Sequence, residues 1–284
     1  MKRVLVTGKN GDLSKAISVS LQKHGYETEN ISLRDDCWKC RCFDQYDAVV
    51  HIAGIVPKEG VTSEDFYRIN TKLTQDFAQK VKQDGVKHFV YISSMSVYGV
   101  KPSLKREEGC VTEDTPCLPS SDYGKSKLLA EECLEKLQDE CFCIARVRVP
   151  SIYGKWKTEY LEQYQHLNEK FPKIPIAFID RYKSIIYIDN LCELIYLLVE
   201  EKTEGIICPD DGAYTAFDIC RLCAPDKKKS RFLGWILERI GSKKSSIKNY
   251  YGAVFYDKKL TDVFEGRYRK YSLEEAIKTI KEEE

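Results

Sequence analysis

Short apolar runs alternate with longer segments of helical spacing over the first two thirds of the chain. We expect strands at residues 2–7, 26–33, 48–53, 88–93 and 141–149. Between them, apolar positions recur at helical spacing and predict helices at 13–24, 63–83 and 121–138. Regular alternation of strands and helices is typical of a parallel sheet with helices on both faces. The sequence therefore predicts an α/β fold built on a doubly wound parallel sheet.

After Gly154 the pattern becomes irregular. We expect a polar-aromatic helix at 158–170, a proline-punctuated segment at 171–175, a helix at 189–201, an amphipathic stretch at 232–240 and a charged helix from Ser272. The first part of the amphipathic stretch, residues 232–237, is either a core helix or a partner-facing one, and we favour the core. We interpret the whole part as a smaller, mixed α/β C-terminal lobe. The expected domains are residues 1–154, with 184–209 returning to the same domain, and a lobe of 155–183 and 210–284.

Charge and hydropathy narrow the possible partners. The chain carries 45 Lys and Arg against 44 Asp and Glu, a net charge of +1, so we expect neither a nucleic-acid nor a membrane partner. The sequence contains no long apolar run, and we expect no secretory leader and a cytoplasmic protein. The twelve cysteines include close pairs, but Cys141–Cys143 lies in a strand-like run and Cys220–Cys223 in a helix-like run. We interpret them as reduced thiols and expect no metal site.

A glycine turn follows the first expected strand. Its sequence is Thr-Gly-Lys-Asn-Gly-Asp-Leu-Ser, from Thr7 to Ser14. Glycines there permit a tight turn and let the backbone approach a pyrophosphate at the helix N-terminus. Ser14 stands where a third small glycine is usual. The turn predicts a Rossmann-type domain that binds NAD or NADP through Gly8, Asn10, Gly11, Asp12 and Leu13.

The end of the second expected strand bears on the choice of cofactor. A carboxylate at this place would hold both ribose hydroxyls of NAD. This chain instead has Ser32, Leu33 and Arg34. A cation can receive a 2′-phosphate, so Arg34 favours NADP(H), whereas Asp35 and Asp36 keep NAD as an alternative.

The strongest motif is a tyrosine and a lysine four residues apart at the start of a helix. In Tyr123-Gly-Lys-Ser-Lys127 the two side chains share one helical face, so an ammonium can stabilise a phenolate. A free phenol has a pKa near 10 and is a poor base at neutral pH, so the chemistry needs such a partner. The strand end at Ser93-Ser94-Met-Ser96 adds hydroxyl groups on the carboxyl edge of the sheet.

Together these motifs resemble the extended short-chain dehydrogenase/reductase superfamily, in particular its nucleotide-sugar epimerase/dehydratase branch. Further motifs in the same order support the resemblance over nearly the whole chain. They are His51-Ile-Ala-Gly54, Asn70, Ser-Ser-Met-Ser-Val-Tyr98-Gly, Arg148-Val-Pro-Ser-Ile-Tyr-Gly154 and Tyr187-Ile-Asp-Asn-Leu191. The resemblance implies an NAD(P)-dependent enzyme that acts on a nucleotide sugar.

The resemblance also implies roles for individual residues. Tyr123 is the expected acid/base, Lys127 lowers its pKa and holds the nicotinamide ribose, and Ser94 hydrogen-bonds the reacting oxygen. Further expected cofactor contacts come from Ala53, Gly54, Asn70 and Pro150. Further expected substrate contacts come from Ser96, Ser151 and Lys183. Lys183 stands where the branch usually has an arginine facing the diphosphate, and lysine keeps that charge without the bidentate fork.

The motif residues leave more than one reaction open. Dehydratases of the branch need an Asp-Glu pair just after the serine of the strand end, where this chain has Met95-Ser96. We therefore expect a nucleotide-sugar 4-epimerase of the UDP-glucose or UDP-N-acetylglucosamine type. The alternatives are an NADP-dependent keto-sugar reductase or dehydrogenase and, in another class, a non-catalytic dinucleotide-binding sensor. The branch also implies a possible homodimer through the helices at 63–83 and 121–138.

Overall fold

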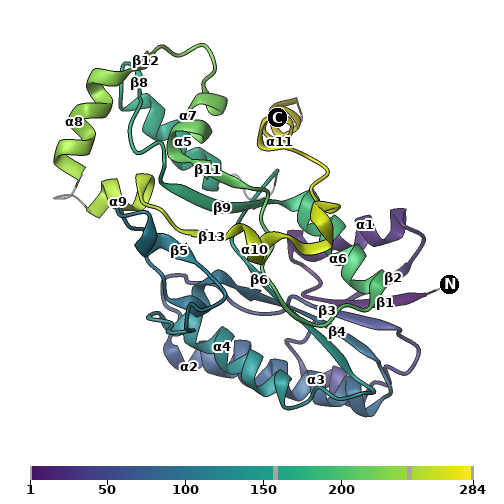
Figure 1. Cartoon of the computed structure of the whole chain (residues 1–284). Coiled ribbons are helices and arrows are strands. Elements are labelled where there is room, and N and C mark those ends of the chain that lie inside the picture. Colours follow the sequence, from purple (N-terminus) through teal and green to yellow (C-terminus); the bar gives the residue numbers. More distant parts are fainter. Residues whose placement is uncertain (1, 156–158, 242–244, 283–284) are drawn as a thin grey trace. The chain divides into compact units, whose positions relative to one another are not determined.

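The computed structural model describes residues 2–155, 159–241 and 245–282, which fall into two compact units (Figure 1). The first unit comprises residues 1–99, 117–149 and 188–208. The second comprises residues 100–116, 150–187 and 209–284. The chain thus enters the first unit three times, so residues far apart in sequence build its sheet.

The first unit is organised around a six-stranded sheet in the order β10-β6-β4-β3-β1-β2, with every pair parallel. Its strands are β1 (Arg3–Thr7), β2 (Glu27–Ile31), β3 (Ala48–His51), β4 (His88–Ser94), β6 (Cys143–Val149) and β10 (Gly205–Ile207). The chain runs outward from β1 to β2, then back past β1 to β3, β4, β6 and β10. This order confirms the predicted doubly wound α/β fold, because the sheet is built in both directions from β1.

Helices cover both faces of this sheet. Helices α1 (Asp12–Lys23) and α6 (Ile188–Glu201) pack together on one face, and α2 (Ser63–Phe66), α3 (Leu73–Gln83) and α4 (Asp122–Glu135) lie on the other (Figure 1). The connection between β2 and β3 holds only the 3₁₀ segment Asp36–Cys40. A second 3₁₀ segment, Met95–Tyr98, follows β4 directly.

The predicted helix at 63–83 contains an irregular segment. Helix α2 passes into six π-helical residues, Tyr67–Lys72, before α3 continues the axis. π-Helical turns widen the backbone spiral and are frequent at functional sites. This one contains Asn70, whose side chain is completely buried.

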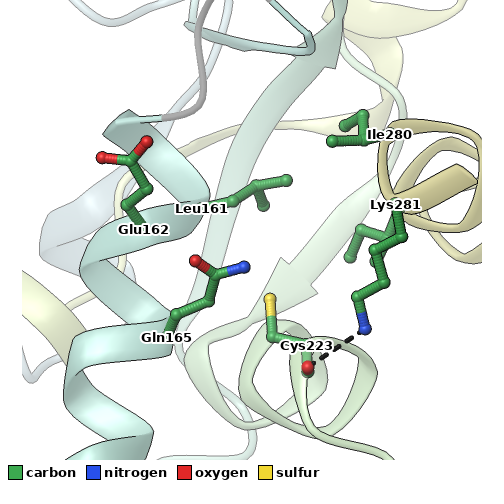
Figure 2. Close-up of a pocket in the computed structure, with 7 residues that line it drawn as sticks. Leu161, Glu162, Gln165, Cys223, Ile280 and Lys281 are labelled. Carbon is green, nitrogen blue, oxygen red and sulfur yellow. Dashed lines mark hydrogen bonds between the residues drawn. The ribbon is translucent and has the colours of Figure 1, made fainter. Parts of the chain in front are cut away.

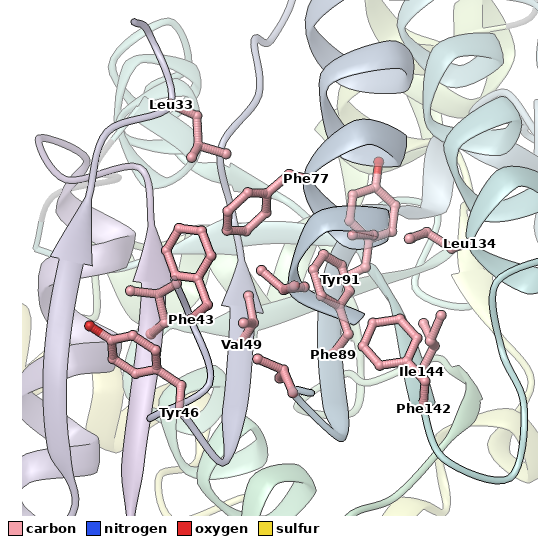
Figure 3. Packing of buried hydrophobic residues seen from close by; sticks show 14 of the residues in the cluster. Leu33, Phe43, Tyr46, Val49, Phe77, Phe89, Tyr91, Leu134, Phe142 and Ile144 are labelled. Atoms are coloured by element: carbon pink, nitrogen blue, oxygen red, sulfur yellow. The ribbon is translucent and has the colours of Figure 1, made fainter. Parts of the chain in front are cut away.

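An aromatic core lies between the sheet and the α3–α4 layer (Figure 3). Phe77 from α3 contacts Phe43 edge-on, with ring centroids 5.6 Å apart, and Phe89 from β4 contacts Phe142 at 6.0 Å. All four rings are fully buried. Aromatic pairs at these separations add to the stabilisation from burial alone, so the core fixes the packing of α3 against the sheet.

The second unit contains three small sheets. In the largest, β9 (Tyr182–Tyr187) lies between β7 (Ser151–Tyr153), which is parallel to it, and β11 (Ala213–Thr215), which is antiparallel. Two parallel pairs join β8 (Ile174–Pro175) to β12 (Lys229–Ser230) and β5 (Cys110–Val111) to β13 (Phe255–Tyr256). The helices are α5 (Glu159–Glu169), α7 (Ala216–Cys223), α8 (Arg231–Gly241), α9 (Ser245–Tyr251), α10 (Lys258–Thr261) and α11 (Leu273–Glu282), with 3₁₀ segments at Glu107–Gly109 and Val263–Gly266. The predicted start of α5 at Thr158 lies outside the described residues.

Other expectations concern cysteines, metals and membranes. All twelve cysteines are free thiols, and Cys37, Cys40, Cys42 and Cys141 are exposed rather than packed. Within the described ranges, no group of three or more His, Cys, Asp or Glu side chains could hold a metal ion. In the same ranges, no helix combines the length and apolar character needed to cross a bilayer.

Candidate dinucleotide and catalytic site

The glycine turn after β1 is closed by hydrogen bonds to its own backbone. Gly8 has a φ of +88°, a conformation that L side chains rarely adopt. The fully buried Ser14 hydroxyl donates to the carbonyls of Gly8, at 2.6 Å, and Gly11, at 2.7 Å. Gly11 is the N-cap of α1 and supplies no side-chain cap. The first-turn N–H groups of α1 are therefore left to an anion or to water, as a pyrophosphate site requires.

The other expected residues of this turn line its outer side. Asn10 and Asp12 are exposed, and Leu13 is half-buried. Asp12 is the first residue of α1, where its carboxylate interacts favourably with the helix dipole, and its Oδ1 lies 3.8 Å from Lys15 Nζ. Their contacts to a cofactor stay a prediction.

The end of β3 is tied to the end of β1. The Thr7 hydroxyl accepts hydrogen bonds from the N–H groups of Ile52 and Ala53, each at 3.0 Å. His51 lies between Thr7 and Thr74, 3.1 Å and 3.0 Å from their hydroxyl oxygens, and burial lowers its pKa to about 3. A neutral, packed histidine fits this place better than a catalytic base does.

Gly54 lies beside the buried Asn70 amide and the Lys127 ammonium. A Cβ added at Gly54 would lie 3.0 Å from Asn70 Oδ1 and 3.7 Å from Lys127 Nζ. Asn70 accepts from the Ile55 N–H at 2.8 Å, and its Nδ2 donates to the Ile55 carbonyl at 3.0 Å and to Ser126 Oγ at 3.1 Å. The amide thus joins the loop after β3 to α4. Because Gly54 has no side chain, an exposed surface remains over these polar groups, and we call it the floor at Gly54.

The side chains after β2 differ in their surroundings. Leu33 is buried in the core, whereas Arg34 is exposed. Asp35 caps the following 3₁₀ segment by accepting from the Cys37 N–H at 3.1 Å, and Asp36 pairs with Lys39 at 2.9 Å. Both carboxylates therefore have local partners, and the guanidinium group at this strand end faces solvent.

The expected catalytic hydroxyls converge at the carboxyl end of β4. Ser94 Oγ donates to Ser96 Oγ at 3.0 Å and accepts from the Ser96 N–H at 3.2 Å. The Ser94 hydroxyl also lies close enough to the Tyr123 phenol to influence its pKa. Burial raises the pKa of the Tyr123 phenol above its ordinary value, and the Ser94 hydroxyl opposes that rise. The phenol is therefore protonated at neutral pH in this arrangement.

Lys127 is buried one helical turn after Tyr123. Its Nζ donates to the Ile92 carbonyl at 2.8 Å and lies 4.8 Å from the centre of the Tyr91 ring. Burial lowers the pKa of Lys127 to about 8, although the Glu131 carboxylate opposes this change. The ammonium is thus anchored on the β4 backbone, and its effect on the pKa of Tyr123 stays a prediction.

A buried ion pair next to these residues escaped the sequence analysis. Glu131 follows Lys127 by four residues on α4, and it accepts from Arg148 Nε at 3.1 Å and Nη2 at 2.7 Å. Their side chains are only 2% and 7% exposed. Glu131 also accepts from Ser93, and the Arg148 guanidinium lies 4.8 Å from the Tyr98 ring. An arginine within the apolar run of β6 was the signal that could have revealed the pair.

Three expected site residues belong to the second unit. Pro150 is buried and Ser151, the first residue of β7, is exposed. Lys183 on β9 is buried, its Nζ donates to the Asn249 carbonyl at 3.1 Å, and burial lowers its pKa to about 8. A buried cation held by a single carbonyl is suited to an anionic group, but the contact of these residues with a substrate stays a prediction.

A small hollow in the second unit holds none of the expected site residues. It lies between α5, α7 and α11 and is lined by Leu161, Glu162, Gln165, Cys223, Ile277, Ile280 and Lys281 (Figure 2). Lys281 Nζ donates to the Cys223 carbonyl at 3.1 Å, which satisfies the end of α7. The hollow has room for little more than a water molecule, so it is a gap in packing rather than a substrate site.

Comparisons with known proteins agree with this geometry. A model of the NAD dependent epimerase/dehydratase family matches residues 4–207. An uncharacterized Sinorhizobium fredii protein is 31% identical over 208 residues, which are 70% of this chain and 56% of that protein. A UDP-glucose 4-epimerase from Vibrio cholerae is 31% identical over 160 residues, 54% of this chain and 47% of that enzyme. The chain thus spans about half the length of these curated relatives.

Solved structures share the fold over nearly the whole chain. The UDP-N-acetylglucosamine 4-epimerase from Bacillus cereus has a TM-score of 0.70 and 19% identity, covering 99% of this chain and 98% of that one. A human epimerase family protein solved with NADPH has a TM-score of 0.73 and 18% identity, covering 99% of each chain. The predicted resemblance to the epimerase/dehydratase family is confirmed: this chain belongs to the NAD dependent epimerase/dehydratase family.

Proposed function

We propose that the protein is an NAD(P)-dependent nucleotide-sugar 4-epimerase that oxidises and re-reduces C4 of its substrate. The observation that carries the proposal is the cluster at the carboxyl end of β4. There, the Ser94 hydroxyl influences the pKa of the Tyr123 phenol, and Lys127 reaches the β4 backbone and the floor at Gly54. The UDP-sugar epimerases among the relatives support a UDP-sugar as substrate.

The first unit offers surfaces that fit a dinucleotide. The uncapped N-terminus of α1 suits the pyrophosphate, and the open floor at Gly54 suits the nicotinamide end, where a larger residue would collide with Asn70. We propose that this unit binds the cofactor and that the second unit, through Ser151 and Lys183, binds the sugar nucleotide. When bound, the nicotinamide would accept a hydride from C4 and later return it.

The side chains of the cluster divide the proton chemistry among them. As a phenolate, Tyr123 takes the proton of the C4 hydroxyl during oxidation, and as the resulting phenol it returns that proton during reduction. Ser94 donates a hydrogen bond to the reacting oxygen and fixes its distance from the phenol. A charged Lys127 stabilises the phenolate, which offsets the effect of burial on the pKa of Tyr123. Hydride return to the opposite face of the sugar then inverts C4.

The alternative is an NADP-dependent keto-sugar reductase, and one observation favours it. Arg34 is exposed at the end of β2, while Asp35 and Asp36 have local partners. A guanidinium group there suits a 2′-phosphate, and reductases that exchange their cofactor in each turnover commonly use NADPH. The same catalytic cluster would then serve reduction alone.

A two-part experiment separates these functions. The purified protein is denatured and any released dinucleotide identified, and the native protein is incubated with UDP-glucose and UDP-N-acetylglucosamine without added cofactor. Retained NAD(H) together with C4-inverted product supports the epimerase. Consumption of NADPH with a 4-keto sugar and no inversion supports the reductase.

A matched pair of variants tests whether the site is catalytic at all. Tyr123→Phe removes only the phenolic hydroxyl, and we expect at least a 100-fold loss of turnover with dinucleotide affinity kept within about threefold. Tyr67→Phe makes the same change on an exposed ring and serves as the control. Unchanged turnover in Tyr123→Phe would contradict the proposed role, and turnover absent even in the unaltered protein would favour a dinucleotide sensor.

A further inference from the structure

Helix α8 in the second unit has a tightly packed inner side. Gly234, Leu237 and Gly241 are buried there. A Cβ at Gly234 would lie 1.9 Å from the Ile176 carbonyl oxygen, so the helix rests directly on the backbone next to β8. The core packing expected for residues 232–237 is found on this side of the helix, where the small residues allow close approach.

The opposite side of α8 presents aromatic rings to solvent. Phe232 is 67% exposed and Trp235 is 53% exposed. The two rings stack with centroids 6.2 Å apart and planes inclined by 20°, and the Arg239 guanidinium lies 4.8 Å from the Trp235 ring. We call Phe232, Trp235 and Arg239 the α8 outer face. Large apolar residues gathered on one exposed surface commonly mark an interaction site.

The sequence around α8 is strongly basic. Seven cationic residues and one carboxylate fall between residues 227 and 244, a net charge of +6 in a chain whose total is +1. The cationic residues are Lys227, Lys228, Lys229, Arg231, Arg239, Lys243 and Lys244. Lys228 and Lys229, just before the helix, are exposed. The total charge of the chain conceals this concentration, because the remaining residues are net acidic.

We propose that the α8 outer face, with the exposed Lys228 and Lys229 just before the helix, docks on the surface of an anionic lipid bilayer. Aromatic side chains on an amphipathic helix enter the boundary between headgroups and acyl chains, and lysines nearby attract anionic headgroups. The cation stacked on Trp235 can stay at headgroup level while the ring enters the boundary. The helix lies on the membrane and does not cross it. This proposal departs from the expectation drawn from total charge, and it does not depend on the proposed activity.

Sedimentation of the full chain with vesicles tests the docking. We expect binding to vesicles that contain phosphatidylglycerol, little binding to pure phosphatidylcholine vesicles, and weaker binding as the salt concentration rises. Phe232→Ser/Trp235→Ser should reduce the affinity for anionic vesicles at least tenfold, and Lys228→Glu/Lys229→Glu should remove the preference for anionic lipid. Equal binding to both vesicle types, or unaltered binding by both variants, would overturn the proposal.

Two controls keep these results specific. Leu118→Ser changes an apolar side chain that is 71% exposed in the first unit, and Lys136→Glu reverses an exposed charge there, so neither should alter vesicle binding. Brominated lipids should quench the fluorescence of the unaltered protein, and Trp235→Phe should remove most of that quenching. If light scattering instead shows a dimer that Phe232→Ser/Trp235→Ser separates, a second copy covers this face and the proposal is wrong.

Discussion

Replacing Lys127 by methionine should make the protein more stable at neutral pH while abolishing its activity. Lys127 is 5% exposed, and burial lowers its pKa from 10.5 to about 8. One pH unit corresponds to about 1.4 kcal/mol, so holding the buried ammonium costs about 3 kcal/mol at pH 7. Loss of the hydrogen bond to the Ile92 carbonyl offsets about 1 kcal/mol. The expected gain in the free energy of unfolding at pH 7 is therefore about 2 kcal/mol.

The contribution of Lys127 to the free energy of unfolding changes with pH in the opposite direction to that of a lysine in a stabilising ion pair. Between pH 8 and 10.5 the unfolded chain keeps the Lys127 proton that the folded protein releases, so the unaltered protein gains stability from this group as pH rises. Lys127→Met lacks that gain. Its stability advantage should shrink by about 2–3 kcal/mol between pH 7 and pH 10.

Urea denaturation followed by circular dichroism measures both quantities, at pH 7 and at pH 10, in the unaltered protein and the variant. Lys125→Met is the matched control, because Lys125 is exposed on the same helix and should show a small change at either pH. A Lys127→Met protein that is less stable at pH 7, or whose stability difference is the same at both pH values, would refute the reasoning.

Three more predictions concern neighbouring groups. Glu131→Gln leaves the Arg148 guanidinium buried without its carboxylate, so urea denaturation should show a free energy of unfolding lower by about 3–5 kcal/mol. Adding Arg148→Met should restore much of this loss, and an unchanged stability of Glu131→Gln would contradict the pairing. Gly54→Ala places a methyl group 3.0 Å from Asn70 Oδ1 and should weaken dinucleotide binding about tenfold in calorimetry. Unchanged binding would show that Gly54 lies outside the cofactor site. Arg34→Ala should reduce NADP(H) affinity about tenfold and change NAD affinity little, whereas equal losses would show no contact with a 2′-phosphate.

Local patterns predicted the fold well because the central strands β1, β3, β4 and β6 are buried along nearly their whole length. The strand expected at 88–93 is β4, His88–Ser94, and the helix expected at 121–138 is α4, Asp122–Glu135. The π-helical residues Tyr67–Lys72 could not be predicted in the same way. Their altered hydrogen-bonding depends on Asn70 turning inward to the Ile55 backbone, a contact between distant segments that periodicity does not record.

In the candidate site, too, the sequence predicted some contacts and not others. Four-residue spacing predicted that Tyr123 and Lys127 share a face, since that follows from helix geometry alone. Spacing did not predict that Lys127 binds the Ile92 carbonyl or that Glu131 meets Arg148, because both depend on how α4 packs across the sheet. For a related reason, spacing could not decide between core packing and a partner-facing surface at residues 232–237. An amphipathic pattern identifies two sides, but the small residue Gly234 decides which one is packed.

The late return of the chain to the six-stranded sheet has a consequence for synthesis on the ribosome. Strand β6 ends at Val149, but its outer neighbour β10 ends only at Ile207. At roughly 5–20 residues per second, about 60 residues of translation separate the two, so the edge of β6 stays unpaired for several seconds. An exposed edge strand invites pairing with other chains. Nascent chains stalled before β10 should therefore aggregate or recruit chaperones, whereas chains extended beyond Cys208 should not.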